Sequence, residues 1–133
     1  MLGSAHIKIP ALTTIALAAA LSLSACGTPA PEPGHADRLA VAVLNNLVVN
    51  KAEAAIADFT PAMARTLPAA NLSQKWKRYQ EVLGDYRSHG QPQDVAQGPL
   101  TVVNLPLAMA QKPGHLQVTV DQSGHIAGLF LLE

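Results

Sequence analysis

The sequence predicts an α+β fold in which helices come first and a four-stranded antiparallel sheet follows. Between residues 37 and 83, apolar residues recur every three or four positions, which is the spacing of one face of a helix. From residue 103 onward, apolar residues alternate with polar ones, which is typical of half-buried strands. A run of helices followed by a run of strands indicates separate helical and sheet layers.

Start and stop signals divide the first half of the chain into four helices. Thr60 is a suitable N-cap residue, and Pro61 stands at the first helical position, where its missing N–H is not needed. The Asn50-Lys51 pair separates the first two helices, and Gly84 is a suitable stop for the last one. The expected helices span residues 37–48, 52–59, 61–67 and 68–83.

The second half of the chain predicts four strands and two turns. Lys112-Pro113-Gly114-His115 has the composition of a type II turn, and Asp121-Gln122-Ser123-Gly124 that of a second turn. The last strand is apolar on both faces, so it is either an exposed edge that invites pairing or a central strand. The expected strands span residues 86–95, 103–109, 116–120 and 126–132, and the first of them is irregular.

The composition favours a folded domain and narrows its partners. The chain has 133 residues, nine of them basic and nine acidic, and 49% of its residues are apolar. Such a chain can bury a core, unlike a disordered one. The single cysteine excludes a disulfide within the chain. Neutrality and the absence of lysine or arginine runs argue against nucleic acid as a partner.

The first 25 residues have the pattern of a secretory signal peptide. Lys8 precedes an uncharged stretch from Ile9 to Cys26, and small residues end that stretch. Its threonines and serines make it too weakly apolar for a bilayer span, which needs about 20 predominantly apolar residues. The segment Leu23-Ser24-Ala25-Cys26 resembles the lipobox of bacterial lipoproteins.

The lipobox resemblance implies cleavage before Cys26 and acylation of that cysteine, with palmitate among the acyl chains. Each buried methylene contributes about 0.8 kcal/mol, so two or three chains hold a protein stably at a membrane. We therefore expect an extracytoplasmic lipoprotein of the cell envelope, anchored to the bacterial cell membrane by its N-terminal lipid. Residues 1–25 would be the signal peptide, 26–34 the acylated cysteine and a Pro/Gly-rich tether, and 35–133 a single α+β domain.

The sequence contains no motif for catalysis, a metal or a cofactor. The serines after Cys26 lie outside any G-x-S-x-G motif, and neither HExxH nor CxxC occurs. We expect no catalytic residue, no metal and no cofactor, and we expect the histidines at the surface or in turns: His35, His89, His115 and His125. A carboxylate in an apolar cavity can act as a general base, but the candidates are more typical of solvated groups: Asp58, Glu81, Asp85 and Asp94.

Five aromatic side chains are the candidates for lining a ligand pocket: Trp76, Tyr79, Tyr86, Phe59 and Phe130. Trp76 and Tyr79 share the apolar stripe of the last helix, which is also the pattern of core residues. Lys75, Lys77 and Arg78 form a small basic cluster around Trp76. This cluster fits either lipid headgroups, an acidic partner, or an ordinary solvated helix face.

From about His35 onward the chain resembles the domain-of-unknown-function family 3887. The residues that carry the resemblance are Leu72-x-x-x-Trp76, Gly84 followed by Tyr86, the Asn50-Lys51 break and the terminal segment Gly124-His125-Ile126-Ala127-Gly128-Leu129. The resemblance implies a cone-shaped α+β domain similar to the ketosteroid-isomerase and nuclear-transport-factor group. It also implies N-terminal helices packed on one face of a curved four-stranded antiparallel sheet, an arrangement that can enclose a pocket.

Members of that family are often joined to an α/β-hydrolase. Here Glu133 ends the chain directly after the last expected strand, so we expect no hydrolase to follow and carry over no catalytic role from one. The isomerase-type carboxylate cannot be placed in this sequence either, and a fold analogy alone does not give function.

The expected function is that of a lipid-anchored extracytoplasmic binding or accessory domain that is not catalytic. Its expected partners are the membrane, through acylated Cys26, and a small apolar ligand or an envelope protein, with no nucleic acid. One alternative is a homodimeric structural or interaction lipoprotein that pairs through its last strand, so both a monomer and a homodimer are open. A second alternative is a carboxylate-based enzyme of the isomerase or dehydratase type.

Overall fold

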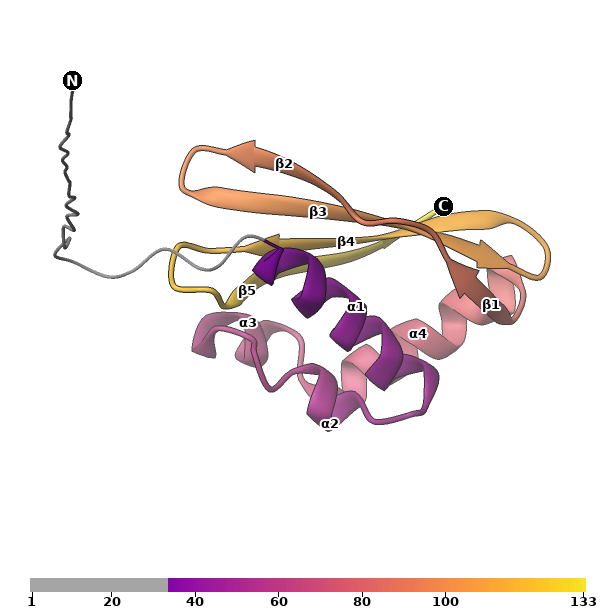
Figure 1. Ribbon diagram of the computed structural model, residues 1–133. Coiled ribbons are helices and arrows are strands. Elements are labelled where there is room, and N and C mark those ends of the chain that lie inside the picture. The colour runs from indigo at the N-terminus through magenta and orange to yellow at the C-terminus, as the bar shows by residue number, and fades with distance from the viewer. Residues whose placement is uncertain (1–33) are drawn as a thin grey trace, which may run out of the picture.

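Helices occupy the first half of the described chain and strands the second (Figure 1). The structure is a computed structural model that describes residues 34–133; the expected signal peptide, Cys26 and nearly all of the tether lie outside the described residues. The helices are α1 (His35–Val48), α2 (Ala52–Ala55), α3 (Pro61–Thr66) and α4 (Ala69–Leu83). The strands are β1 (Tyr86–His89), β2 (Gln93–Gln97), β3 (Leu100–Met109), β4 (Pro113–Val120) and β5 (Ile126–Leu132).

The fold is α+β, but the open antiparallel sheet has five strands, so the expected count of four is wrong. The single irregular strand expected over residues 86–95 is two strands, β1 and β2, which both pair with the long strand β3. Gly90-Gln91-Pro92 separates them because Pro92 has no N–H to donate to a ladder. The Gly90 N–H bonds the carbonyl of Pro106 at 2.9 Å and keeps this break close to β3.

The helices lie on one side of the sheet (Figure 1), and not all of them touch it. Helix α1 packs on β3 and β4, α3 lies next to β5, and α2 packs against α1 and α4 instead of the sheet. Apolar side chains from the helices and from the covered face of β3, β4 and β5 form one continuous core. Within residues 34–133, no helix is both long enough and apolar enough to cross a membrane.

Two of the expected helix boundaries are confirmed, one by a hydrogen bond and the other by a backbone angle. The Thr60 hydroxyl oxygen accepts a hydrogen bond from the Met63 N–H at 3.0 Å, and Pro61 stands at the first helical position of α3. Gly84 ends α4 with φ of 93°, a left-handed value that favours glycine.

The second helix is shorter than expected because the residues after Ala55 turn away from it and pair with the sheet. It ends at Ala55, and Phe59 forms an isolated parallel bridge with Ile126 of β5. The Ile126 N–H donates to the Asp58 carbonyl at 2.8 Å, and the Thr60 N–H donates to the Ile126 carbonyl at 2.9 Å. Residues 58–60 therefore cover the outer edge of β5 at its beginning.

The type II turn expected at residues 112–115 is wrong, whereas the turn at 121–124 is confirmed. Pro113 and Gly114 lie inside β4, paired with Ala108 and Leu107, and the chain reverses over residues 110–112. Gly114 is required by a tertiary contact, because a Cβ atom there would overlap the hydroxyl group of Tyr79. In the second turn, the Gly124 N–H donates to the Asp121 carbonyl at 3.0 Å.

Candidate binding groove at the edge of the sheet

A groove of about 910 Å³ lies between the edge strand β5 and the helices α3 and α4. One wall is the outer edge of β5 from Ala127 to Leu131, with Glu133 beyond it. The other wall is α4, and Met63, Thr66 and Leu67 close one end. The groove is therefore built from three elements that the core holds in place.

The α4 wall is a stripe of side chains one helical turn apart. Five side chains of α4 line the groove, at intervals of three, one, three and four residues that keep them on one face of the helix. They are Asn71, Gln74, Lys75, Arg78 and Val82. All five are exposed, because the buried face of α4 points instead toward the core. Lys75 and Arg78 place two positive charges on this wall.

The β5 wall offers unpaired backbone groups. β5 ends the strand order and pairs only with β4, which answers the open question of whether it is central or at an edge. In an antiparallel pair, the backbone groups of successive residues point alternately toward the partner strand and away from it. The His115 N–H and the Leu132 carbonyl both point into the space between β4 and β5, because both bond the Tyr79 hydroxyl there. Leu129 and Leu131 therefore direct their N–H and carbonyl groups to the outer edge.

The Tyr79 hydroxyl group links the helical wall to the sheet. It donates to the Leu132 carbonyl and accepts from the His115 N–H at 3.1 Å, so it replaces a direct ladder bond between β4 and β5. Burial raises the pKa of Tyr79; the His115 hydrogen bond opposes this and the negative charge of Glu133 adds to it. The phenol is therefore neutral at physiological pH and acts as a fixed hydrogen-bonding bridge.

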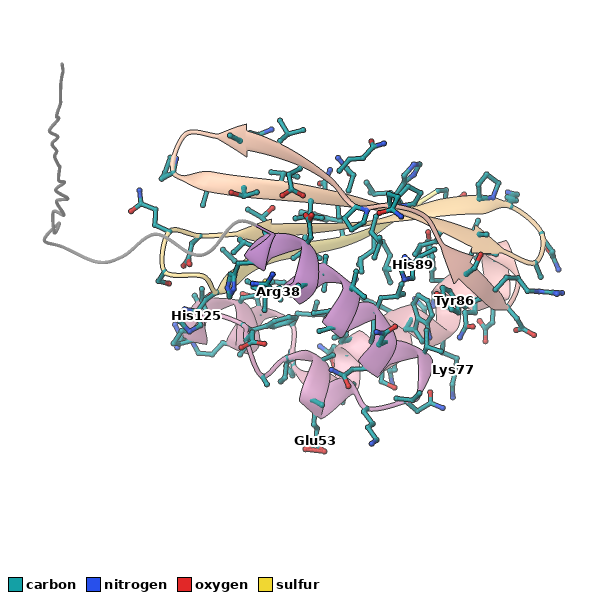
Figure 2. The ribbon with its side chains drawn as sticks, in the orientation of Figure 1. Arg38, Glu53, Lys77, Tyr86, His89 and His125 are labelled. Carbon is teal, nitrogen blue, oxygen red and sulfur yellow. The ribbon has the colours of Figure 1, made fainter. Side chains whose placement is uncertain are left out.

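Four of the five aromatic residues selected from the sequence lie in the core or against it, and the fifth, Phe130, is exposed. Trp76 has ring contacts with Tyr79 at 5.9 Å and with Tyr86 at 6.1 Å between centroids, and Figure 2 shows Tyr86 reaching from β1 toward the helices. Trp76 is only 3% exposed, and Phe59 is buried in the same core. Tyr79 and Phe130 line the groove, and Phe130 is 55% exposed.

The four candidate carboxylates all lie outside the groove lining. Asp58, Glu81, Asp85 and Asp94 are exposed side chains. Asp94 lies on the helix-covered face of β2, where its carboxyl group can share a hydrogen bond with that of Asp37 in α1 when one of the two is protonated. This bond, partial burial and the like charge of Asp37 together raise the pKa of Asp94 to about 6.

The Asp37–Asp94 pair needs a proton to satisfy its oxygens. One carboxylate oxygen of Asp37 is buried and has no hydrogen-bond donor within residues 34–133. Two ionised carboxylates cannot bond each other, so the pair shares a hydrogen bond only when one of them is protonated. Neither Asp37 nor Asp94 lines the groove.

An Asp–Ser–His cluster occurs in the turn between β4 and β5, in an order unsuited to catalysis. The Ser123 hydroxyl lies 2.7 Å from a carboxylate oxygen of Asp121 and 2.8 Å from Nδ1 of His125. A nucleophilic triad needs histidine between the other two groups, but here the serine is in the middle. Burial of Asp121 opposes its ionisation, but hydrogen bonds from His125 and Ser123 outweigh it and lower the pKa of Asp121. The cluster therefore fixes the turn.

The histidines are dispersed over the described chain. His35 Nε2 lies 3.1 Å from the Gly124 carbonyl and ties the start of α1 to the β4–β5 turn, and Figure 2 places His125 at the same end of the molecule. His89 and His115 lie on β1 and β4. Within residues 34–133, no group of three histidine, cysteine, aspartate or glutamate side chains could hold a metal ion.

Sequence reasoning did not identify most of the groove. Asn71, Gln74 and Val82 were not among the candidates, although their spacing with Lys75 and Arg78 would have shown a shared helix face. The outward backbone groups of Leu129 and Leu131 carry no sequence signal, because they depend on the register between β4 and β5.

The comparisons with known proteins give one family. The model of the DUF3887 family, described as a protein of unknown function, matches residues 40–129. The match includes α4 and β5 up to Leu129, and so most of the groove. No curated protein matches the chain significantly. No solved structure does so either.

Proposed function

The chain belongs to the DUF3887 family, and from this premise we propose that it is a non-catalytic binding domain whose binding site is the groove between α4 and β5. The observation that carries the proposal is the wall of β5. An open strand edge and two basic side chains line one hollow of the surface, and Phe130 on that strand is exposed. Free backbone groups and exposed apolar surface together are typical of a site that receives a partner.

The proposal includes a lipid anchor outside the cytoplasm. The lipobox-like segment that ends at Cys26 supports it, together with the uncharged stretch that precedes that cysteine. Proline at positions 29, 31 and 33 favours an extended tether, at about 3 Å per residue, between the acylated cysteine and the domain. The tether would then hold the domain about 20–25 Å from the membrane surface.

The proposal also includes a fold of the ketosteroid-isomerase and nuclear-transport-factor kind. Helices on one side of an antiparallel sheet support this likeness (Figure 1). No isomerase chemistry is transferred, because Asp58, Glu81, Asp85 and Asp94 all lie outside the groove lining.

Membrane fractionation of a bacterial host that expresses the full-length chain tests the anchor. We expect the protein in the membrane fraction and labelled by an alkyne analogue of palmitate, and we expect Cys26→Ser to lose both properties. Because Cys26 is the only cysteine, no other thiol can take the label. Membrane association of the Cys26→Ser protein equal to that of the parent would refute lipid anchoring.

Native mass spectrometry of the full-length protein, purified without denaturant, tests the groove. We expect additional mass that leaves on gentle activation. Asn71→Trp would fill the groove and remove this mass, whereas Ser73→Trp, on the outward face of the same helix, would retain it. Equal retention by both variants would place the ligand elsewhere and contradict the proposal.

A homodimer that pairs through β5 is the second candidate, and one observation favours it. Phe130 and Leu132 are 55% and 40% exposed on the edge strand, which is unusual for large apolar side chains. Sedimentation analysis at high protein concentration tests this candidate. A dimer that Phe130→Asp dissociates would support it, and a monomer at every concentration would reject it.

A further inference from the structure

We propose that the occupant of the groove is an extended, acidic peptide segment that adds a sixth strand to the sheet along β5. The inference rests on the proposed function, since it names the chemistry of the partner that the same groove binds. It is carried by three features of the groove: the free backbone edge, the two cations of α4 and the exposed ring of Phe130.

The open edge of β5 can pair with a few residues of an antiparallel peptide strand. Leu129 and Leu131 direct two N–H donors and two carbonyl acceptors outward. Along residues 127–132, no backbone group elsewhere in the described chain bonds this edge. Two peptide residues, placed opposite Leu129 and Leu131, would exchange both hydrogen bonds with each of them. Strand addition of this kind takes its affinity from main-chain bonds and its specificity from alternate side chains.

The alternation of side chains assigns a charge to two of the peptide positions. Residues directly opposite one another in a sheet point to the same face. Leu129 is buried on the helix-covered face, so the peptide residues opposite Leu129 and Leu131 point toward α4. Lys75 and Arg78 line that wall, and the only acidic side chain in the lining is Glu133, beyond the end of β5. Acidic side chains at these two positions therefore complement the wall.

The same alternation predicts an apolar residue at the peptide position between the two acidic ones. The peptide residue opposite Phe130 points to the uncovered face of the sheet, where the Phe130 ring is exposed. An apolar cross-strand neighbour would remove part of this ring from water. The preferred segment thus reads acidic, apolar, acidic.

The charges favour such a peptide over a second copy of this chain. Pairing two β5 edges about a two-fold axis would form one continuous sheet with both helical layers on the same side. The two α4 walls would then face each other, and Lys75 and Arg78 of one copy would oppose the same cations of the other. Like charges in a shared groove oppose association.

Titration of the ¹⁵N-labelled full-length protein with the peptide acetyl-TEVET-amide, followed by NMR, tests the inference. We expect saturable shifts at the amides of Leu129 and Leu131, and about tenfold or weaker binding after Lys75→Glu plus Arg78→Glu. Lys77→Glu is the matched control because Lys77 is a cation of the same helix outside the groove lining (Figure 2). It should leave the affinity unchanged.

Modified peptides separate strand addition from simple charge attraction. N-methylation of the two glutamates removes the N–H groups that face β5 and should abolish binding, whereas N-methylation of the central valine should not. The peptide TKVKT should not bind. Equal binding of the acidic and basic peptides, equal effects of the two methylation patterns, or shifts that report self-association would each overturn the inference.

The peptide titration and the native mass spectrometry experiment can fail independently of each other. If no peptide binds but Asn71→Trp still displaces a carried ligand, the acidic-peptide inference fails and the proposed binding function stands. If neither experiment shows binding in the groove, both fail.

Discussion

A single hydroxyl group decides how β4 and β5 meet near the end of the sheet. Tyr79→Phe removes the bridge between His115 and Leu132 and leaves a partly buried N–H and carbonyl without their partner. We expect a loss of about 1–2 kcal/mol in the free energy of unfolding, measured by urea denaturation. Tyr86→Phe is the control, because the Tyr86 hydroxyl makes no hydrogen bond within residues 34–133. Equal stability of the two variants would show that the bridge is unimportant.

Gly114 makes room for that hydroxyl group. Gly114→Ala would place a methyl group on the Tyr79 oxygen and near the Leu83 side chain. Overpacking of this kind costs about 1–3 kcal/mol, which thermal denaturation can measure. Gly90→Ala, whose Cβ would find only ordinary contacts with Pro106, should change stability much less. Combining Gly114→Ala with Tyr79→Phe should recover part of the loss, and failure to do so would place the strain elsewhere.

The Asp37–Asp94 pair makes stability depend on pH. The pKa of Asp94 is raised to about 6 in the folded protein, so folding favours the protonated carboxyl. The stability from this pair is complete at low pH and is lost as the pH rises through about 6. Asp94→Asn should therefore stabilise the protein at about pH 7.5, by about 1 kcal/mol or less because solvent screens the pair, and flatten the change between about pH 4.5 and 7.5. Urea denaturation at both pH values measures this, and an unchanged pH profile would contradict it.

At the scale of single residues, sequence patterns identified which residues are buried but not which residues they contact. Spacing placed Tyr79 on the buried stripe of α4, which is where it lies. The Pro113-Gly114 pair looked like a turn because turn propensity is local, whereas the real requirement for glycine is a contact with a tyrosine 35 positions earlier in the chain. Local chemistry cannot reveal such a contact.

At the scale of elements, β5 should show two classes of backbone amide. The Leu129 and Leu131 N–H groups face the open edge, and the Phe130 N–H faces β4. We expect fast hydrogen exchange at Leu129 and Leu131 and slow exchange at Phe130, measured by NMR on the protein without added peptide. Slow exchange at all three would mean that another chain covers the edge.

Element types were predictable because their periodicities are strong, and element boundaries were not. The repeat of apolar residues in α4 and the alternation in β4 both led to the observed structure. Residues 56–59 continue a helical pattern but leave the helix, because Phe59 pairs with β5. Likewise, β1 and β2 are separate because both find a place along β3.

The whole described domain should unfold as one unit. One core cluster contains residues of α1, α2, α4, β3, β4 and β5, so no layer has a core of its own. Trp76, the only tryptophan, lies in this core and reports on it by fluorescence. We expect urea unfolding curves from Trp76 fluorescence and from far-UV circular dichroism to coincide. Separate midpoints would indicate that helices and sheet unfold independently.

The arrangement of the whole molecule explains why the groove was only partly predictable. Tyr79, Phe130 and the basic residues Lys75 and Arg78 were selected from the sequence, and the fold brings them to one surface. Trp76 and Phe59 belong to the same aromatic class but lie in the core outside the groove lining, and Tyr86 packs against that core. Composition cannot separate these two groups, because the division depends on where α4 crosses the edge of the sheet.

The partial cover over β5 bears on the tendency of the protein to form fibrils. Residues 58–60 occupy the edge at Ile126, and the register shift that follows interrupts the ladder between Thr119 and Val120. Only the short stretch around Leu129 and Leu131 is left open, beside two positive charges. Such an edge can receive one short strand, and the cations beside it oppose the stacking of identical chains. The domain thus keeps an edge that can receive a partner without polymerising through it.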